Sequence, residues 1–460
     1  MSNLKVFGKL ELEGAVKISG NKNSALPCLA ASLLLEPGQA IELTNVPEIR
    51  DVRVFIEILK NLGVEINQTG QGRLLIKAPP IKLGGKEIKI SPEEARKLRA
   101  SILLVGPLLR LYDRVLLPQP GGCKIGPRPI DTHLEAFEQF GVKISQTNDG
   151  FTCLEKVQDN EQRAYKNLWL RETSVTATEN ILLFIAGSKR DNKKIYFEIK
   201  NAACEPHVQT LCSLLGDIST GTLEIDGEGS NLLSVCLSEY WNININKEDI
   251  WRWPLKFDIE PDYIEALTFA VAAAVTKSNI VIKNINPEHL ELIKKYLDQM
   301  GVFSYFAKRT DSYDWLVWGK KVFESPPAVS PTLKEVKAEP WYGLPTDALP
   351  LFLVLATQRK GELEFVDYMY NGRLINLANA LNNMGADIKI LGNRSLLVKG
   401  PTPLRGRTQL SPDLRNGVGL VLASLCAEGE SVIQNFEIVE RGYENLPEKL
   451  TTLGAKVEVT

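Results

Sequence analysis

Apolar residues recur at helical spacing in six segments of the chain, and each segment ends in an apolar residue followed by glycine. In the first segment the apolar positions are Val52, Phe55, Ile56 and Leu59. The expected helix ends are Leu62-Gly63, Phe140-Gly141, Leu215-Gly216, Met300-Gly301, Met384-Gly385 and Leu453-Gly454. Glycine readily adopts the left-handed backbone conformation that closes a helix. The pattern therefore predicts six amphipathic helices, each followed directly by a strand.

Six further segments of helix length are apolar on nearly every side. They begin near Ser24, Ala100, Ala177, Ala266, Ala348 and Gly417. A helix that is apolar all round is enclosed by other structure. One buried helix, one amphipathic helix and several short strands recur about every 70 to 85 residues, which is typical of stacked α/β units. Six such units predict an α/β protein of two similar domains, each with three units.

Composition narrows the classes of function. The 460-residue chain has a formal net charge of −2, so it offers no general attraction to nucleic acid or to an anionic membrane. Its apolar runs, such as 266–275, are too short to span a bilayer, and the N-terminus has no signal-peptide pattern. Seven cysteines form no CxxC pair, and only three histidines are present, so no zinc site is indicated. We expect a cytoplasmic protein without metal, cofactor, nucleic-acid or membrane partners.

Three cations, Lys22, Arg99 and Arg415, stand at the N-terminal ends of the predicted buried helices. A cation at this end opposes the helix dipole by a few tenths to about 1 kcal/mol unless an anion compensates it. If the buried helices run parallel, their N-termini share one face and form a site for anions. Other polar residues at these ends, which can equally be simple N-caps, are Ser174, Asp262 and Asp347. The cations therefore favour an anionic ligand.

Residues 119–133 form an expected irregular loop, because they contain three prolines and three glycines. The loop places Cys123 beside Lys124 and Arg128, and both cations favour the reactive thiolate. Two interpretations are open: a mobile lid that brings a cysteine to a substrate, or a surface loop with an incidental cysteine. The chain has neither a P-loop nor a Rossmann glycine motif after a strand, which argues against nucleotide triphosphate hydrolysis and dinucleotide redox chemistry.

At these residues the sequence resembles the enolpyruvyl transferase family over essentially its whole length. The landmarks are Ser19-Gly20-Asn21-Lys22-Asn23, Leu98-Arg99-Ala100-Ser101, the segment from Pro120 to Asp131, Asn201-Ala202-Ala203, Pro261-Asp262, Pro345-Thr346-Asp347, Asp413-Leu414-Arg415 and Glu440-Arg441-Gly442-Tyr443-Glu444. The resemblance implies an inside-out barrel of two lobes, each with three βαβαββ repeats around parallel buried helices. One lobe is expected at residues 22–255 and the other at residues 1–21 plus 256–460, with the lobes closing over the substrates.

The resemblance also implies the reaction. Enolpyruvyl is expected to pass from phosphoenolpyruvate to the 3-hydroxyl of UDP-N-acetylglucosamine, with release of phosphate, as a step in peptidoglycan precursor synthesis. The catalytic residues are expected to be Lys22, Cys123, Asp347 and Arg415. Asp347 matches the candidate base for the sugar hydroxyl, and Cys123 matches a loop residue that acts as an acid at C3 or aids product release. The epoxide fosfomycin is expected to alkylate Cys123.

The same resemblance assigns the binding residues. Phosphoenolpyruvate is expected at Lys22, Arg128, Arg373, Arg415 and Arg441. The nucleotide acceptor is expected at Asn23, Arg99, Arg128, Pro129, Ile130, Asp131, Ser174, Val175, Thr176 and Asp347. Arg373 and Arg415 would hold the phosphoenolpyruvate carboxylate in bidentate fashion.

Several residues depart from the family pattern, and they cluster on the acceptor side. Glu172 stands where the family can have a basic residue near the diphosphate, and Thr176 replaces a glycine of the nucleotide loop. These departures leave two alternatives open. The chain can be a specialised paralogue that enolpyruvylates another nucleotide such as UMP, or a nucleotide-binding protein without catalytic activity. A shikimate-type transferase is disfavoured, because its Lys-Ser-rich first motif is absent and the Cys123 loop is present.

Overall fold

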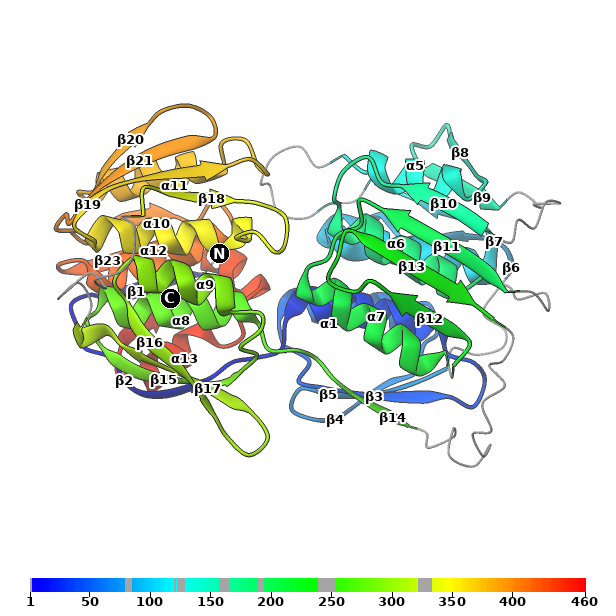
Figure 1. The fold of residues 1–460 in the computed structure, drawn as a ribbon, viewed down its shortest axis with the longest axis horizontal. Coiled ribbons are helices and arrows are strands. Elements are labelled where there is room, and N and C mark those ends of the chain that lie inside the picture. The colour runs from blue at the N-terminus through cyan, green and yellow to red at the C-terminus, as the bar shows by residue number, and fades with distance from the viewer. Residues whose placement is uncertain are drawn as a thin grey trace. The chain divides into compact units, whose positions relative to one another are not determined.

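The computed structural model describes residues 2–78, 85–119, 121, 129–156, 165–188, 194–219, 221–238, 254–321 and 333–460. Contacts within the chain divide it into two compact units (Figure 1). Unit 1 comprises the described residues of Met1–Ser19 and Pro261–Thr460. Unit 2 comprises those of Gly20–Gly122 and Arg128–Glu260. The chain therefore enters unit 2 after Ser19 and leaves it after Glu260.

Each unit contains three four-stranded sheets among its described residues. The first sheet of unit 1 has the strand order β16 (Phe303–Lys308), β17 (Tyr313–Trp318), β15 (Asn279–Ile285), β2 (Glu13–Lys17). The second has the order β18 (Glu335–Ala338), β19 (Gly361–Asp367), β21 (Ser395–Gly400), β20 (Asp387–Ile390). The third has the order β22 (Thr408–Leu410), β23 (Glu430–Gln434), β1 (Asn3–Phe7), β24 (Lys456–Val459). The first sheet of unit 2 has the strand order β14 (Leu255–Asp258), β3 (Ala40–Thr44), β5 (Arg73–Lys77), β4 (Ile66–Gly70). The second has the order β6 (Gly85–Lys89), β7 (Tyr112–Leu117), β9 (Thr152–Lys156), β8 (Val142–Gln146). The third has the order β10 (Tyr165–Trp169), β11 (Ile195–Lys200), β13 (Leu232–Leu237), β12 (Leu223–Asp226).

All six sheets have one topology: one parallel strand pair, extended by two antiparallel neighbours. The run β18, α10, β19, α11, β20, β21 shows the repeat as βαβαββ. The N-terminal strands belong to unit 1, since β1 pairs with β23 and β24 and β2 pairs with β15. The predicted fold of six α/β repeats is confirmed.

The buried helices begin where the sequence predicts them. They are α1 (Lys22–Ala31), α4 (Val105–Leu111) after the 3₁₀ turn η2 (Arg99–Leu104), α6 (Val175–Ala186), α8 (Tyr263–Val275), α10 (Leu349–Gln358) after η4 (Thr346–Ala348), and α12 (Leu414–Cys426). In unit 1, α8, α10 and α12 contact one another pairwise and the sheets lie outside them (Figure 1). Every residue of α8 is buried, which explains why its sequence has no polar face.

The amphipathic helices are α2 (Arg50–Asn61), α5 (Asp131–Gln139), α7 (Pro206–Ile218), α9 (Glu291–Gln299), α11 (Arg373–Asn383) and α13 (Leu446–Thr452). Shorter elements are α3 (Pro92–Lys97), η1 (Ser32–Leu34), η3 (Gly319–Lys321) and η5 (Phe436–Arg441). The predicted closing glycine has a positive φ after five of these helices. The prediction for Gly216 is wrong, because Gly216 lies inside α7. That helix continues to bury Ile218, and the left-handed residue is Gly221 instead.

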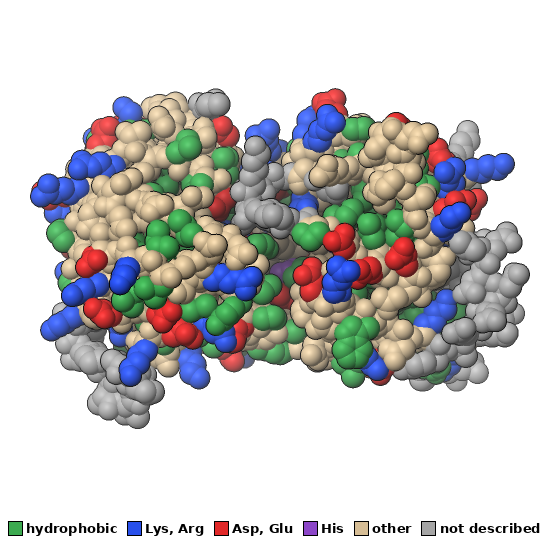
Figure 2. All heavy atoms as spheres, turned by 90° about the horizontal axis from the view of Figure 1, so that it is seen from above, with side chains coloured by type: hydrophobic (Ala, Val, Ile, Leu, Met, Phe, Trp, Pro, Cys, Tyr) green, Lys and Arg blue, Asp and Glu red, His purple; other side chains and the backbone are tan. Residues whose placement is uncertain are grey.

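Each unit has its own apolar core. In unit 1 the core surrounds α8, α10 and α12, and in unit 2 it surrounds α1, α4 and α6. On the face seen in Figure 2, Lys and Arg side chains are interspersed with Asp and Glu, as expected from the near-zero net charge. Within the described residues, no helix combines the length and apolar character needed to cross a membrane.

Candidate active site

Asp347 lies between two arginines in unit 1. Its Oδ1 accepts a hydrogen bond from Arg373 Nη2 at 2.8 Å, and its Oδ2 accepts one from Arg415 Nε at 2.9 Å. The three side chains come from three elements: η4, the first residue of α11 and the second residue of α12. Arg373 Nη1 also donates to Thr346 Oγ1 at 3.1 Å, and Thr346 donates to Asp367 at 3.0 Å. The structure thus brings together three of the predicted unit 1 site residues.

The two guanidinium groups are almost completely shielded from solvent. Arg373 and Arg415 side chains are 1% and 5% exposed, whereas the Asp347 side chain is 32% exposed. Burial alone would raise the pKa of Asp347, but the charges of Arg373 and Arg415 hold it well below its ordinary value. Arg373 Nε and Arg415 Nη1 are buried and make no hydrogen bond with the described residues. Each arginine therefore retains a donor that a carboxylate ligand can satisfy.

The backbone around the arginines is held by Asp413 and Asn416. Asp413 caps α12, since its Oδ1 accepts from the N–H groups of Arg415 and Asn416 at 3.0 Å each. Asn416 Nδ2 donates to the Arg373 carbonyl at 2.8 Å and so ties α12 to the start of α11. The Arg415 guanidinium also lies 5.3 Å from the centre of the Tyr443 ring, a cation–π distance. These contacts fix both guanidinium groups before any ligand arrives.

The predicted N-caps have different outcomes. Ser174 accepts a hydrogen bond from Ala177 N, and Asp262 accepts from Ile264 N and Glu265 N, so both are caps. Asp347 is not an N-cap, because it lies inside η4, whose N-cap is Pro345, and the N-cap of α10 is Ala348. Its carboxylate instead binds the two arginines, which is consistent with a role beyond local helix stability.

Sequence reasoning missed a second buried polar group in unit 1. Lys449 Nζ donates to Glu265 Oε1 at 2.6 Å and to Ser19 Oγ at 2.7 Å, and Ser19 N donates to Glu265 Oε2 at 2.8 Å. The Glu265 side chain is 3% exposed. Glu265 was visible as a polar residue in an apolar helix, but nothing in the sequence pointed to Lys449 as its partner. The group holds Ser19 at the point where the chain leaves unit 1.

Unit 2 carries the first predicted cation. Lys22 Nζ lies 3.4 Å from Asp51 Oδ2. The Lys22 side chain is 20% exposed. Lys22 is the first residue of α1, and the side chain of the N-cap Asn21 accepts a hydrogen bond from Asn23 N at 2.8 Å. In the structure, protein carboxylates lie next to Lys22 and Arg415: Asp51 faces Lys22 and Asp347 faces Arg415.

Arg99, Pro129, Ile130, Asp131, Ser174, Val175 and Thr176, predicted to bind the acceptor, lie around the N-terminal ends of α5 and α6, whereas Asn23 is the second residue of α1. Arg99 Nη2 donates to the Pro129 carbonyl at 3.3 Å, and Ile130 and Asp131 lead into α5. Thr132 Oγ1 donates to Glu172 Oε1 at 3.0 Å, and His133 Nε2 lies 3.0 Å from Thr176 Oγ1. Ser174 and Val175 begin α6 between these two contacts. The two family departures, Glu172 and Thr176, are therefore each held by a residue of α5.

Of the other predicted site residues, Cys123 and Arg128 lie outside the described residues. Arg441 ends η5 in unit 1 and is half-buried.

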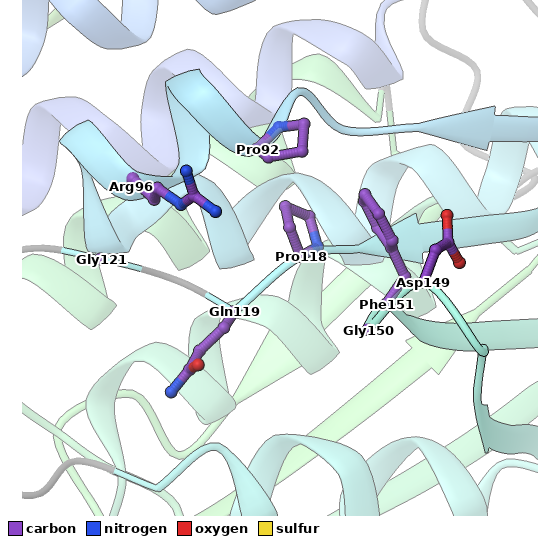
Figure 3. A pocket seen from close by; sticks show the side chains of 8 residues that line it. All are labelled: Pro92, Arg96, Pro118, Gln119, Gly121, Asp149, Gly150 and Phe151. Carbon is purple, nitrogen blue, oxygen red and sulfur yellow. The ribbon is translucent and has the colours of Figure 1, made fainter.

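The start of the Cys123 loop is anchored to α3. Gly121 N donates to the Ala95 carbonyl at 2.9 Å, and a side-chain carbon on Gly121 would lie 1.9 Å from the Arg96 carbonyl oxygen. A cavity of about 380 Å³ lies at this anchor (Figure 3). Its lining residues are Pro92, Arg96, Pro118, Gln119, Gly121, Asp149, Gly150 and Phe151. Figure 3 shows Arg96 of α3 on one side and Asp149 and Phe151 on the other.

The family model described as EPSP synthase (3-phosphoshikimate 1-carboxyvinyltransferase) matches residues 7–450. The chain therefore belongs to this family, the enolpyruvyl transferases. Among solved structures, the enolpyruvyl transferase NikO from Streptomyces tendae superposes with a TM-score of 0.78 at 21% identity, covering 100% of this chain and 99% of NikO. EPSP synthase from Acinetobacter baumannii gives a TM-score of 0.69 at 18% identity, with both chains fully covered. Both show the same fold.

Curated relatives are more similar in sequence. A UDP-N-acetylglucosamine 1-carboxyvinyltransferase from Bradyrhizobium diazoefficiens is 34% identical over 453 residues, covering 98% of this chain and 97% of its own. One from Treponema denticola is 33% identical over 454 residues, covering 99% of this chain and 98% of its own. The similarity to these enzymes thus extends over both units.

Proposed function

We propose that the chain transfers the enolpyruvyl group of phosphoenolpyruvate to the 3-hydroxyl of UDP-N-acetylglucosamine and releases phosphate. The observation that carries the proposal is the cluster of Asp347, Arg373 and Arg415, with a buried free donor on each guanidinium group. A carboxylate base next to two carboxylate-binding arginines suits a reaction between a hydroxyl and a small carboxylate substrate. The full-length similarity to 1-carboxyvinyltransferases supports the choice of substrates.

In this mechanism, Arg373 and Arg415 bind the phosphoenolpyruvate carboxylate through the donors that make no hydrogen bond within the described part of the chain. Lys22, Arg128 and Arg441 bind its phosphate. Asp347 accepts the proton of the sugar hydroxyl as that oxygen bonds to C2, while C3 receives a proton. The tetrahedral intermediate then returns the proton from C3 to the group that supplied it and expels phosphate, which restores the double bond. Cys123 donates at C3 or aids product release.

Binding of phosphoenolpyruvate also prepares the base. Asp347 is a weak base while two guanidinium charges lower its pKa. When the substrate carboxylate shares those charges, the pKa of Asp347 rises towards the range in which it accepts a proton. We place the acceptor at Asn23, Arg99, Pro129, Ile130, Asp131, Ser174, Val175 and Thr176, and assign the enzyme to cytoplasmic peptidoglycan precursor synthesis.

One observation favours a second acceptor. The Glu172 carboxylate is exposed beside the start of α6, held there by Thr132, and repels a diphosphate. A nucleotide with less phosphate charge, such as UMP, experiences less of this repulsion. The second candidate function is therefore enolpyruvyl transfer to UMP or a similar nucleotide.

Phosphate release from phosphoenolpyruvate, assayed with each acceptor in turn, tests the proposal. We expect turnover with UDP-N-acetylglucosamine and none with shikimate 3-phosphate. Turnover with UMP alone would replace the first function by the second. Absence of turnover with every acceptor would indicate a binding protein without catalytic activity.

Fosfomycin tests the role of the loop cysteine. We expect a single adduct, on Cys123, because Cys153 is buried, and because burial raises the pKa of Cys28, Cys212, Cys236 and Cys426 and that of Cys204 to about 11. Such thiols carry little thiolate at neutral pH. Mass spectrometry of the Cys123 peptide measures the adduct, and Cys123→Asp should remain active but insensitive. Modification of other cysteines with Cys123 untouched would remove Cys123 from the site.

A further inference from the structure

A chain of hydrogen bonds with a fixed direction runs from α4 to α6 in unit 2. The backbone N–H of Gly106 donates to Asn180 Oδ1 at 2.7 Å, which orients the Asn180 amide. Asn180 Nδ2 then donates to the Ile102 carbonyl at 2.8 Å and lies 3.2 Å from His133 Nδ1. An amide NH₂ group has no acceptor capacity, so His133 Nδ1 must accept and carries no proton.

The next link follows from the charge state of His133. Its side chain is buried, and burial, reinforced by the charge of Arg99, lowers the pKa of His133 to about 3. The ring is therefore neutral near pH 7, and its single proton is on Nε2. Nε2 lies 3.0 Å from Thr176 Oγ1, so His133 donates and Thr176 accepts. The hydroxyl hydrogen of Thr176 remains available, and within the described part of the chain it has no acceptor.

The free donor is well placed for the nucleotide. Thr176 is the second residue of α6, is half-buried and follows the cap Ser174. Arg99 acts electrostatically on its partner His133, so the positive charge of Arg99 also attracts an anionic oxygen that accepts from Thr176 and opposes the repulsion from Glu172. The glycine that the enolpyruvyl transferase pattern has at this position supplies no side-chain donor. The Thr176 hydroxyl is thus a feature of this chain.

We propose that Thr176 determines acceptor specificity, an inference that rests on the proposed function. The Thr176 hydroxyl, oriented by His133, donates a hydrogen bond to a phosphate oxygen of the nucleotide acceptor. His133 is a positioning residue that acts through Thr176. The hydroxyl favours acceptors that carry phosphate over the bare nucleoside, because the oxygen it contacts is charged.

Calorimetric binding of UDP-N-acetylglucosamine, UDP and uridine to the whole protein tests this proposal. We expect Thr176→Val to raise Kd for both phosphate-bearing ligands roughly 10- to 100-fold and to leave uridine unchanged. Thr176→Ser, which keeps the hydroxyl, should bind like the wild type. Unchanged UDP binding by Thr176→Val would overturn the inference while the wild-type activity stands. Equal weakening of uridine would also overturn it. A wild type that binds no nucleotide would overturn the proposed function itself.

Nitrogen NMR of His133 tests the relay independently of activity. The chain has three histidines, so comparison with His133→Asn assigns the signals. We expect Nδ1 to be unprotonated and Nε2 to carry the proton from pH 8 to pH 5. A proton on Nδ1, or a ring that titrates in this range, would overturn the direction of the relay.

Discussion

At the residue scale, the environment of Asp347 makes stability depend on pH. A carboxyl group with a lowered folded-state pKa contributes fully above its unfolded pKa of about 4, and the contribution is lost as pH falls through the folded value. Asp347→Asn should therefore reduce the free energy of unfolding by about 1–3 kcal/mol at pH 7, allowing for the partial exposure of the side chain. Urea denaturation at pH 7, 5 and 3 measures the difference.

The same experiment has a clear control. The difference between wild type and Asp347→Asn should be constant between pH 7 and 5 and should shrink at pH 3. Asp387→Asn removes an exposed carboxylate from β20 in the same unit and should change little. A difference that grows on acidification would show that the arginines do not stabilise the charged form of Asp347.

Glu172 provides a second prediction at this scale. Glu172→Gln removes the negative charge and can still accept the hydrogen bond from Thr132. Because the side chain is exposed, the charge repulsion is modest, so KM for UDP-N-acetylglucosamine should fall several-fold, and less at high salt. Steady-state kinetics with both substrates measures this, with Glu224→Gln on β12 as the control. An unchanged or higher KM would show that the carboxylate does not oppose the acceptor.

The sequence identified the cations at the helix N-termini more readily than the carboxylates that pair with them. Lys22, Arg99 and Arg415 stood out because positive charge at the N-terminal end of a helix opposes the helix dipole. Their partners could not be found in the same way: Asp51 lies 29 positions from Lys22 and Asp347 lies 68 from Arg415. Only the folded chain brings these pairs together. The relay through His133 was hidden for the same reason.

At the scale of elements, the anchor of the Cys123 loop can be tested at Gly121. An alanine methyl group there has no room beside Arg96, so the chain must move and the loop must start from a different position. We expect Gly121→Ala to lower kcat at least tenfold, because displacement of a catalytic segment by about 1 Å can have a still larger effect. Stopped-assay kinetics together with thermal unfolding separates loss of activity from loss of fold.

Gly216 supplies the matched control, since it is also a glycine replaced by alanine. It lies inside α7, where an added methyl group meets nothing within 4 Å. Gly216→Ala should stabilise the protein by about 0.5–1 kcal/mol and leave kcat unchanged. Equal activity of both variants would show that the Gly121 anchor does not position the loop.

The same glycine shows where elements can be predicted. Buried and amphipathic helices were found because burial imposes a repeating pattern on many residues at once. A helix end depends on one or two residues, and a glycine after an apolar residue is compatible with either an end or an interior position. In α7 the burial of Ile218 outweighs the preference of Gly216 for a turn. The predictions of whole helices were therefore confirmed, whereas the predicted end of α7 at Gly216 was wrong.

At the scale of the whole molecule, separate cores make each unit a candidate unfolding unit. Lys449 is the sharpest test, because it is the cation paired with the buried Glu265 in unit 1. Lys449→Met leaves a buried carboxylate without its partner and should cost about 3–5 kcal/mol. Hydrogen exchange should then show faster opening of α8, whose amides report on unit 1.

The division into two units predicts that the destabilisation by Lys449→Met is confined to unit 1. Exchange in α6 of unit 2 should stay at the wild-type rate, because its core shares no residue with the core around α8. Lys389→Met removes an exposed cation on β20 and should leave both helices unchanged. Equal acceleration in α6 and α8 would instead mean that the molecule unfolds as one cooperative body. Lys449 also binds Ser19, the last residue of unit 1 before the chain enters unit 2. If α6 opens more slowly than α8, Lys449→Met should therefore reduce turnover while unit 2 keeps its affinity for the nucleotide.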